Sequence, residues 1–258
     1  NFIDVKTSEQ LTQAVALANE TGNRVIRIAE GQYLVTETLI VSGHNITIIG
    51  AGDTPFDVTL KGNGMVATSE VDNLIRLTGD NFYLANLTLQ EVGNHLVQVA
   101  SESGGDKPIF RNLVFRDGYE QLLKVSYNKK TLNAYSANGI VENCLFAYTR
   151  GIGPNWYIGG IDAHGIKSWT IENNIFYGIA SPRKHIAEHA IHLWNATEHN
   201  VVRHNLIVDA DRGIGFGMRN GKLNEQGYSN LGGEISNNVI YHQDNGHPFA
   251  DVAINLED

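Results

Sequence analysis

Short apolar segments recur along the chain, and most of them begin with an asparagine. The series consists of Asn86-Leu-Thr-Leu, Asn112-Leu-Val-Phe, Asn143-Cys-Leu-Phe, Asn174-Ile-Phe-Tyr, Asn205-Leu-Ile-Val and Asn238-Val-Ile-Tyr. Successive asparagines are 26, 31, 31, 31 and 33 residues apart. A period of this length without helical periodicity predicts stacked coils of short β-strands, in which alternate residues face an apolar interior.

The residues between these segments support the same interpretation. Glycine and asparagine are each present 27 times. Both tolerate the left-handed backbone conformations that corners between strands require. Asparagines at equivalent corners can also stack, each amide bonding the next. No linker interrupts the repeat, so we expect one domain over residues 1–258.

The two ends of the predicted stack differ. The pattern over residues 7–20 predicts an amphipathic capping α-helix, with Thr7 or Ser8 as its N-cap and Gly22 as its stop signal. Strands are expected at 25–28, 39–41 and 46–49. No comparable cap follows the last apparent strand near Asn255. Because exposed ends of stacked coils need protection, we expect a C-terminal partner, a further domain or a frayed last coil.

Several strings resemble right-handed parallel β-helix proteins of the pectate lyase-like superfamily. They are the N-terminal helix followed by Gly31-Gln-Tyr and Asn45-Ile-Thr-Ile-Ile-Gly-Ala-Gly, and the repeated Asn-Asn-x-Ile-Tyr type of segment. With the periodicity, the resemblance implies an all-β fold, a single-stranded right-handed parallel β-helix of about eight coils. It also implies a secreted or periplasmic protein that acts on carbohydrate.

The chemical motifs of this superfamily are matched less closely. The Trp-Ile-Asp-His and Arg-Phe-Pro-Arg types of motif found in true pectate lyases are absent. Gly160-Ile-Asp-Ala-His is similar to the Asp-Pro-His-Asp motif of alginate epimerases, with Ala163 in place of the proline and Gly165 in place of the second acid.

Composition and charge exclude several classes of protein. The 258 residues carry a net charge of −9, which argues against nucleic acid as a partner because phosphate binding requires a basic face. No apolar run approaches the about 18 residues of a membrane span. The single cysteine, Cys144, excludes an internal disulfide framework and a cysteine-based zinc site.

Histidines are concentrated in one part of the chain, with six of the ten between residues 164 and 204. Strand-like segments that start at Leu123, Ile161 and Ile191 align by their alternation, which directs these three residues inward and the next ones outward. Neighbouring coils lie about 4.8 Å apart, so the outward side chains form two contacting columns. The columns consist of Lys124, Asp162 and His192, and of Ser126, His164 and Trp194. Gly213, Gly215 and Gly217 are expected to leave an open floor beside them.

We interpret the resulting groove as a catalytic site. The candidate catalytic residues are His164, His192, Asp162, Lys124 and Arg212. The candidate substrate-binding residues are Trp194, Arg150, Glu188, His189, Trp156 and Tyr157. A histidine titrates near neutrality and suits a base, arginine binds carboxylates bidentately, and exposed aromatic rings stack on sugars.

Structural alternatives accompany these roles. Asp162 can simply pair with Lys124, and Arg150 and Arg212 lie in matching Arg-Gly-Ile-Gly strings that can mark a repeated corner. Asp162 and Glu188 are candidate ligands for Ca²⁺ or another divalent metal, because carboxylate oxygens suit calcium. A zinc ion on Asp162 and the two histidines is an alternative. No organic cofactor is expected.

Three functions fit this set of residues. The first is a polysaccharide lyase, in which a base removes the C5 proton of a uronate and a cation or metal neutralises its carboxylate. The second is a glycoside hydrolase or uronate epimerase; hydrolysis needs two carboxylates, with Asp162 and Glu188, or Asp209 and Asp211, as candidates. The third is a non-catalytic glycan-binding or adhesin or tailspike-type module. The excess of histidines over paired acids favours the lyase, with a polysaccharide or oligosaccharide as partner.

Overall fold

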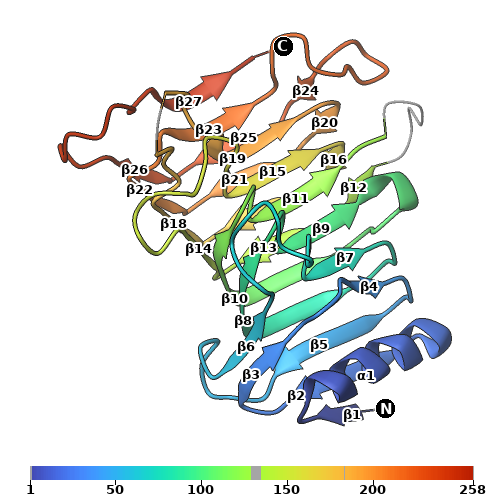
Figure 1. Ribbon diagram of the computed structural model, residues 1–258. Coiled ribbons are helices and arrows are strands. Elements are labelled where there is room, and N and C mark those ends of the chain that lie inside the picture. Colours follow the sequence, from blue (N-terminus) through green and yellow to red (C-terminus); the bar gives the residue numbers. More distant parts are fainter. Residues whose placement is uncertain (1, 129–134, 183, 258) are drawn as a thin grey trace.

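The computed structural model describes residues 2–128, 135–182 and 184–257. In this part of the chain, short strands pair in parallel and stack coil upon coil from the N-terminal helix to the C-terminal strand (Figure 1). Three sheets run along the stack.

The largest sheet has 15 strands among the described residues. Its main path runs through β1 (Phe2–Val5), β2 (Arg24–Ile28), β5 (Ile46–Gly50), β8 (Tyr83–Val92), β10 (Ile109–Gly118), β13 (Ile140–Glu142), β17 (Thr170–Glu172), β21 (Val201–Arg203) and β25 (Glu234–Ser236). The other strands of this sheet pair beside the main path. They are β3 (Gly31–Leu34), β6 (Val58–Lys61), β14 (Leu145–Ala147), β18 (Ile175–Tyr177), β22 (Leu206–Val208) and β26 (Val239–Tyr241).

The second and third sheets are shorter. The second contains, in spatial order, β4 (Leu39–Val41), β7 (Ile75–Leu77), β9 (Val97–Ala100), β11 (Leu123–Ser126), β15 (Ile161–His164), β19 (His189–Trp194), β23 (Arg212–Phe216) and β27 (Val252–Leu256). The third contains β12 (Ser136–Ala137), β16 (Ile166–Lys167), β20 (Thr197–Glu198) and β24 (Asn230–Leu231). A 3-10 helix, η1 (Ser101–Ser103), follows β9. The predicted stack of parallel strands is therefore confirmed, whereas its right-handed, single-stranded winding stays a prediction.

The N-terminal helix forms where the sequence predicts it. Helix α1 (Ser8–Thr21) is capped by the Thr7 hydroxyl, which accepts a hydrogen bond from the Gln10 amide at 3.2 Å. Gly22 ends the helix at φ +60°, a left-handed conformation that glycine adopts without strain. The buried face of α1 consists of Leu11, Ala14, Val15 and Ala18. It joins the apolar core at the N-terminal end of the stack (Figure 1). Among the described residues, no helix is both long and apolar enough to cross a membrane.

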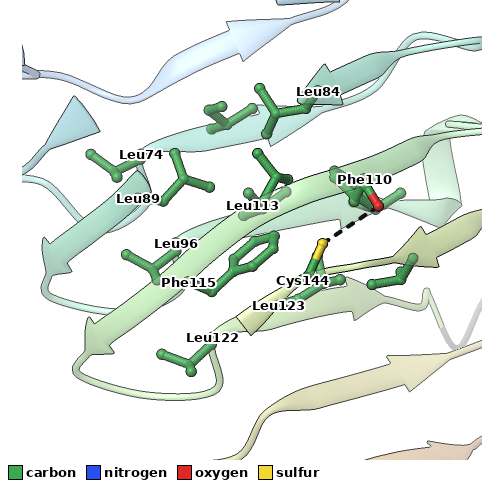
Figure 2. Packing of buried hydrophobic residues seen from close by; sticks show 14 of the residues in the cluster. Leu74, Leu84, Leu89, Leu96, Phe110, Leu113, Phe115, Leu122, Leu123 and Cys144 are labelled. Atoms are coloured by element: carbon green, nitrogen blue, oxygen red, sulfur yellow. Dashed lines mark hydrogen bonds between the residues drawn. The ribbon is translucent and has the colours of Figure 1, made fainter. Parts of the chain in front are cut away.

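The interior of the coils is filled with leucine, isoleucine and phenylalanine. Figure 2 shows leucine and phenylalanine side chains from several coils meeting in this interior, with Cys144 among them. The Cys144 thiol lies 3.6 Å from the carbonyl oxygen of Phe110. Further along the stack, the rings of Phe115, Phe146 and Phe176 pile face to face, with centroids 4.5 and 4.7 Å apart. This aromatic ladder follows from the register of β10, β14 and β18, which places the three residues opposite one another.

The asparagine repeat differs from the predicted one by a single position. Asn112 and Asn143 have φ values of 50° and 55°, but the matching left-handed residue in the next coil is Asn173, not Asn174. Asn174 instead lies in the place of Cys144, and its amide donates to Asn205 at 3.0 Å inside the core. The interval of 31 residues therefore matched Asn143, an asparagine at a corner, to Asn174, an asparagine that is buried and stacks inside the core.

The apolar residues of the last strand are less well covered. Ile254 is 46% exposed and Leu256 is 70% exposed in β27. The expected C-terminal partner or further domain stays a prediction.

Candidate active site

The first predicted column forms on the second sheet. Lys124 of β11 lies opposite Asp162 of β15, which lies opposite His192 of β19. The flanking residues of these strands point into the core, as the alternation predicts, and Ile161 and Ile191 are 0% exposed. In the second column, His164 lies opposite Trp194. The predicted placement is therefore confirmed for Lys124, Asp162 and His192 and for the pair of His164 and Trp194, whereas the chemical roles of both columns remain predictions.

The column is less exposed than the sequence predicts. Asp162 and His192 are each only 3% exposed although they project away from the apolar core. The Trp194 side chain contributes to this cover, because its indole nitrogen donates to Asp162 Oδ1 at 2.7 Å and its ring stacks on His192 at 5.2 Å. The expectation that this column faces solvent is wrong for these two residues.

Asp162 is held by three partners. Lys124 Nζ contacts its Oδ2, Trp194 donates to its Oδ1, and His164 Nε2 lies 3.3 Å from its Oδ1. Burial alone would raise the pKa of the carboxyl, but the Lys124 ammonium and His164 outweigh burial and hold the pKa of Asp162 well below its usual range. The structural alternative, a pair with Lys124, is thus present in the structure.

His164 is oriented from both sides of its ring. Asn195 Oδ1 accepts the Lys222 backbone amide at 2.6 Å, which fixes the orientation of the Asn195 side chain. Its Nδ2 then faces His164 Nδ1 at 3.3 Å. Nδ1 therefore accepts from Asn195, and in the neutral ring the proton is on Nε2, which lies 3.3 Å from Asp162 Oδ1 and 3.2 Å from Lys124 Nζ. Burial lowers the pKa of His164, although the nearby Asp162 charge opposes the shift.

A cavity of about 380 Å³ opens beside these residues. We call it the basic cavity; its lining residues are Lys124, Ser126, Tyr127, His164, Trp194, Asn195, Asn220 and Lys222. Among the described residues, its lining includes two lysines and no carboxylate, so its field attracts anions. Burial raises the pKa of Tyr127, which keeps its hydroxyl protonated. Two of the cavity's lining residues were not predicted from the sequence: Tyr127, which directly follows β11, and Lys222, which lies in a loop with no periodic signal.

A second group includes His192, whose ring stacks on the Trp194 ring. We call Glu188, His189 and His192 the histidine cluster. His192 Nδ1 lies 3.0 Å and His189 Nδ1 lies 3.6 Å from the same oxygen of Glu188, Oε2. His192 Nε2 lies 3.1 Å from the Gly217 carbonyl oxygen. Burial would raise the pKa of Glu188, but the two neighbouring histidines lower it strongly. Burial lowers the pKa of His189.

Two further cavities adjoin this cluster. The histidine cavity, of about 350 Å³, is lined by Glu188, His189, His192, Arg212, Gly217, Met218, Asp251, Val252, Asn255 and Glu257. The aromatic cavity, of about 610 Å³, is lined by Trp156, Lys184, His185, Ile186, Glu188, Arg212, Phe249 and Asp251. Because Glu188 and Arg212 line both, the two cavities are neighbours.

The predicted glycine floor is absent from this part of the structure. Gly213, Gly215 and Gly217 are buried; the first two lie in β23 and Gly217 directly follows it, and β27 pairs along the outer edge of β23. A Cβ atom on Gly215 would meet the His189 ring, and one on Gly217 would meet the backbone of Glu257. These glycines therefore admit close packing of a neighbouring ring and strand, and they form no open surface.

The two arginines are not equivalent. Arg212 begins β23, lies opposite His189 and pairs with Asp251 at 3.2 Å. Arg150 is exposed in the turn region after β14 and lies outside the linings of the three cavities. The matching strings thus adopt different conformations, and the idea of a repeated corner is wrong.

The remaining predicted residues are divided between the cavities. Trp156 and Tyr157 are 51% and 42% exposed, as expected for aromatic rings that meet a ligand, and Trp156 lines the aromatic cavity. Glu188 and His189 line the histidine cavity. The expectation of Asp162 and Glu188 as metal ligands stays a prediction; the described residues that group three candidate donors are Glu188, His189 and His192. Two imidazoles and one carboxylate do not fit Ca²⁺, which takes oxygen ligands.

Comparison with solved structures confirms the resemblance at the level of the fold. An alginate lyase from Paenibacillus sp. str. FPU-7 superimposes with a TM-score of 0.57 at 16% identity, over 98% of this chain and 99% of that one. The Escherichia coli protein ybhc gives 0.54 at 12%, over 92% and 85%. A pectin methylesterase variant in complex with a hexasaccharide gives 0.53 at 12%, over 96% and 94%.

A scan against protein-family models and a search of curated proteins find no match. At such identities the structural similarity shows a shared parallel β-helix fold and leaves the chemistry to be argued from the site.

Proposed function

We propose that this chain is a carbohydrate-active enzyme, specifically a polysaccharide lyase that cleaves a uronate-containing acidic polysaccharide by β-elimination in the basic cavity. One observation carries the proposal. Lys124, His164, Tyr127 and Lys222 converge on a single cavity whose described lining residues include no carboxylate. Such a cavity supplies a cation for the uronate carboxylate, a neutral base and a protonated acid.

The lysines give the cavity a charge that the whole chain lacks. The net charge of −9 would repel an anionic polymer at long range, but distant charges are screened beyond about 8 Å at physiological salt. Lys124 and Lys222 act within the cavity itself. Because Lys124 is already paired with Asp162, Lys222 is the proposed main counterion of the substrate carboxylate, and it would stabilise the negative charge that develops when C5 loses its proton.

His164 is the proposed base. Its Nδ1 carries the lone pair, and burial lowers its pKa, so the ring is neutral at pH 7. The contact with Asn195 is long, 3.3 Å, and leaves this nitrogen able to take the C5 proton. Asp162 then stabilises the imidazolium through Nε2, at 3.3 Å. Asp162 is thus a positioning residue in this proposal.

Tyr127 is the proposed acid. Burial raises the pKa of its phenol, so it holds a proton to donate. In the proposed step, the C5–H electron pair forms the C4–C5 double bond, the C4–O bond breaks, and the leaving oxygen takes the Tyr127 proton. No water is consumed. The products are a new unsaturated end and a saturated one.

The other predicted residues take different roles in this proposal. His192 is not the base in this proposal, because it lines the histidine cavity and not the basic cavity. Trp194 forms part of the wall of the basic cavity. Trp156 and Tyr157 offer exposed rings for stacking on sugar units outside the cleaved bond. Arg212 is held by Asp251 in the neighbouring cavities, where it can meet a further carboxylate.

The hydrolase alternative has weaker support. Asp211 accepts the backbone amides of Ser181 and Ala187 and contacts His247, and Asp209 binds Gln243. Both carboxylates thus hold loops together. The fold also leaves non-catalytic glycan binding as an alternative outcome of the test. Because polymeric substrates of this kind are met outside the cytoplasm, we propose a secreted or periplasmic location.

The proposal is tested on a panel of polymannuronate, polyguluronate and polygalacturonate. Ultraviolet absorbance of the unsaturated end should rise on at least one polymer. His164→Gln and Tyr127→Phe should each lower the rate by about 10²-fold or more. The matched controls are His44→Gln and Tyr241→Phe, which change exposed residues away from the basic cavity and should keep the rate of the wild type.

Other outcomes would contradict the proposal. Full activity in both cavity variants would remove the site. Reducing ends released without unsaturation would indicate a hydrolase. Glycan binding without any bond cleavage would indicate a binding module.

A further inference from the structure

We propose that the histidine cluster, Glu188, His189 and His192, is a binding site for a divalent transition metal such as Zn²⁺. This inference is independent of the lyase proposal, because it rests on other residues and its test needs no substrate.

Three acceptor atoms face one point in the cluster. Glu188 Oε2 lies 3.0 Å from His192 Nδ1 and 3.6 Å from His189 Nδ1. Candidate ligand atoms of the three residues lie within 4.8 Å of one another. Ligands around a tetrahedral zinc ion, with bonds of about 2.0–2.2 Å, are separated by roughly 3.3 Å. The observed spacing therefore requires only small side-chain movements to close on an ion.

His192 is in the tautomer that a metal needs. Its Nε2 donates to the Gly217 carbonyl oxygen at 3.1 Å, which leaves the lone pair on Nδ1. A metal-bound histidine usually donates its other N–H to a carbonyl or carboxylate in this way. With its lone pair on Nδ1, His192 faces the Glu188 carboxylate at 3.0 Å, and a positive charge between the two atoms, a proton or a metal ion, stabilises this contact.

His189 is the second, independent observation. It is 2% exposed, and neither ring nitrogen has a hydrogen-bond partner among the described residues. A buried polar group without a partner is rare in folded proteins. A proton shared by Glu188 and His192 would leave Nδ1 of His189 without a partner. A metal ion at the same point would bind the ligand atoms of all three residues.

Gly215 makes room for the ring of His189. It lies on β23 opposite His192, and a Cβ atom there would come within 2.8 Å of His189 Nε2. Gly215 does not have a positive φ, so an alanine would fit its backbone but not the ring. This position therefore offers a variant that disturbs the cluster without removing a ligand.

The surroundings favour a cation with nitrogen ligands. The histidine cavity contains three carboxylates, Glu188, Asp251 and Glu257, against one arginine, Arg212, which pairs with Asp251. Two imidazoles select zinc, cobalt, nickel or copper over calcium and magnesium. The cavity of about 350 Å³ next to the cluster leaves a further coordination position for water or for an oxygen of a ligand.

The test uses the purified full chain after treatment with a chelator. Zn²⁺ and Co²⁺ are titrated in separately by calorimetry, the bound metal is counted by mass spectrometry, and the visible spectrum of the Co²⁺ form is recorded. We expect one metal per chain and the intense visible bands of four-coordinate Co²⁺. His189→Ala and Glu188→Gln should abolish this binding, and Gly215→Ala should weaken it about tenfold or more, like the loss of an outer contact.

His44→Ala is the matched control, because His44 also lies beside an acid, Asp80 at 3.5 Å, but on the surface. It should bind metal as the wild type does. Absence of Zn²⁺ and Co²⁺ binding to the wild-type chain would overturn the proposal. Unchanged binding in folded His189→Ala and Glu188→Gln proteins would overturn it as well. Should a variant fail to fold, the Co²⁺ spectrum of the wild type decides, because octahedral bands without imidazole ligation contradict the site.

Discussion

The pair of Lys124 and Asp162 allows a quantitative test of how the column is held. We consider Asp162→Asn, which keeps the shape of the side chain and removes its charge. The side chains are 11% and 4% exposed, so the remaining Lys124 ammonium would be largely buried without a counterion. Breaking a buried ion pair in this way costs about 3–5 kcal/mol. Lys124 also lines the basic cavity and can reach water there, so we expect a loss near the lower limit, about 3 kcal/mol.

This loss converts into a measurable shift. An unfolding entropy of about 2.1 cal/mol/K per residue, over the 258 residues, makes 3 kcal/mol equal to a fall in Tm of about 6 °C. Urea unfolding followed by circular dichroism and differential scanning calorimetry would both report it. The double variant Lys124→Met, Asp162→Leu is the comparison, because replacing both partners with apolar residues is often close to neutral. It should lie within about 1 kcal/mol of the wild type.

The dependence on pH has a definite sign. The pKa of Asp162 in the folded chain is far below its ordinary value of 3.8, so its contribution is complete above pH 3.8 and is lost as the pH falls further. The difference between wild type and Asp162→Asn should therefore be constant from pH 5 to 8 and shrink below about pH 4. A single variant as stable as the wild type, or a double variant less stable than the single one, would refute this reasoning.

Three further predictions concern the core and its titrating groups. Burial, together with the charge of Lys124, lowers the pKa of His95 from 6.5 to about 4. About 3 kcal/mol of stability that is present above pH 6.5 should therefore be lost as the pH falls from 6.5 to 4. Urea unfolding at pH 7 and 4.5 should show this loss, and His95→Gln should reduce it. Burial raises the pKa of Cys144 to about 12, so a thiol reagent at pH 8 should modify the unfolded chain and spare the folded one, and equal rates would contradict this. Phe146→Ala opens a hole between two stacked rings and should cost about 3–5 kcal/mol in urea unfolding, whereas Tyr241→Phe on the surface should cost less than about 0.5 kcal/mol.

The alternation of side chains was sufficient to predict the column. The strand period of two fixes which residues face the core, and one inward residue per coil, such as Ile161 and Ile191, sets the register of its neighbours. Lys124, Asp162 and His192 therefore lie where the sequence places them. The same pattern does not report what covers a strand from outside, so the burial of Asp162 under Trp194 was not foreseen.

Spacing alone was less reliable at the corners. The interval of 31 residues matched Asn143 to Asn174, yet the coil between them closes in 30 residues and Asn173 is the corner residue. Arg150 and Arg212 share a string and an offset, but one lies in a turn region and the other begins a strand. Local sequence does not fix the length of a loop. The number of residues in the preceding coil therefore determines which residue occupies the corner.

The cavities could be predicted only in part. Tyr127 could have been predicted from the alternation of side chains, because it directly follows the strand that contains Lys124. Lys222 comes from a loop whose approach to His164 depends on the Asn195 bond to its backbone. From the sequence, His192 was a catalytic candidate and Glu188 and His189 were substrate-binding candidates, because only the folded β19 brings His189 and His192 to one carboxylate.

The most direct test of the central claim is the mass of the products released from a defined oligouronate. β-Elimination in the basic cavity predicts two fragments whose masses sum to that of the substrate, one of them carrying the double bond, and it predicts that His164→Gln releases neither. Fragments that together exceed the substrate by the mass of one water would show hydrolysis and would contradict the account.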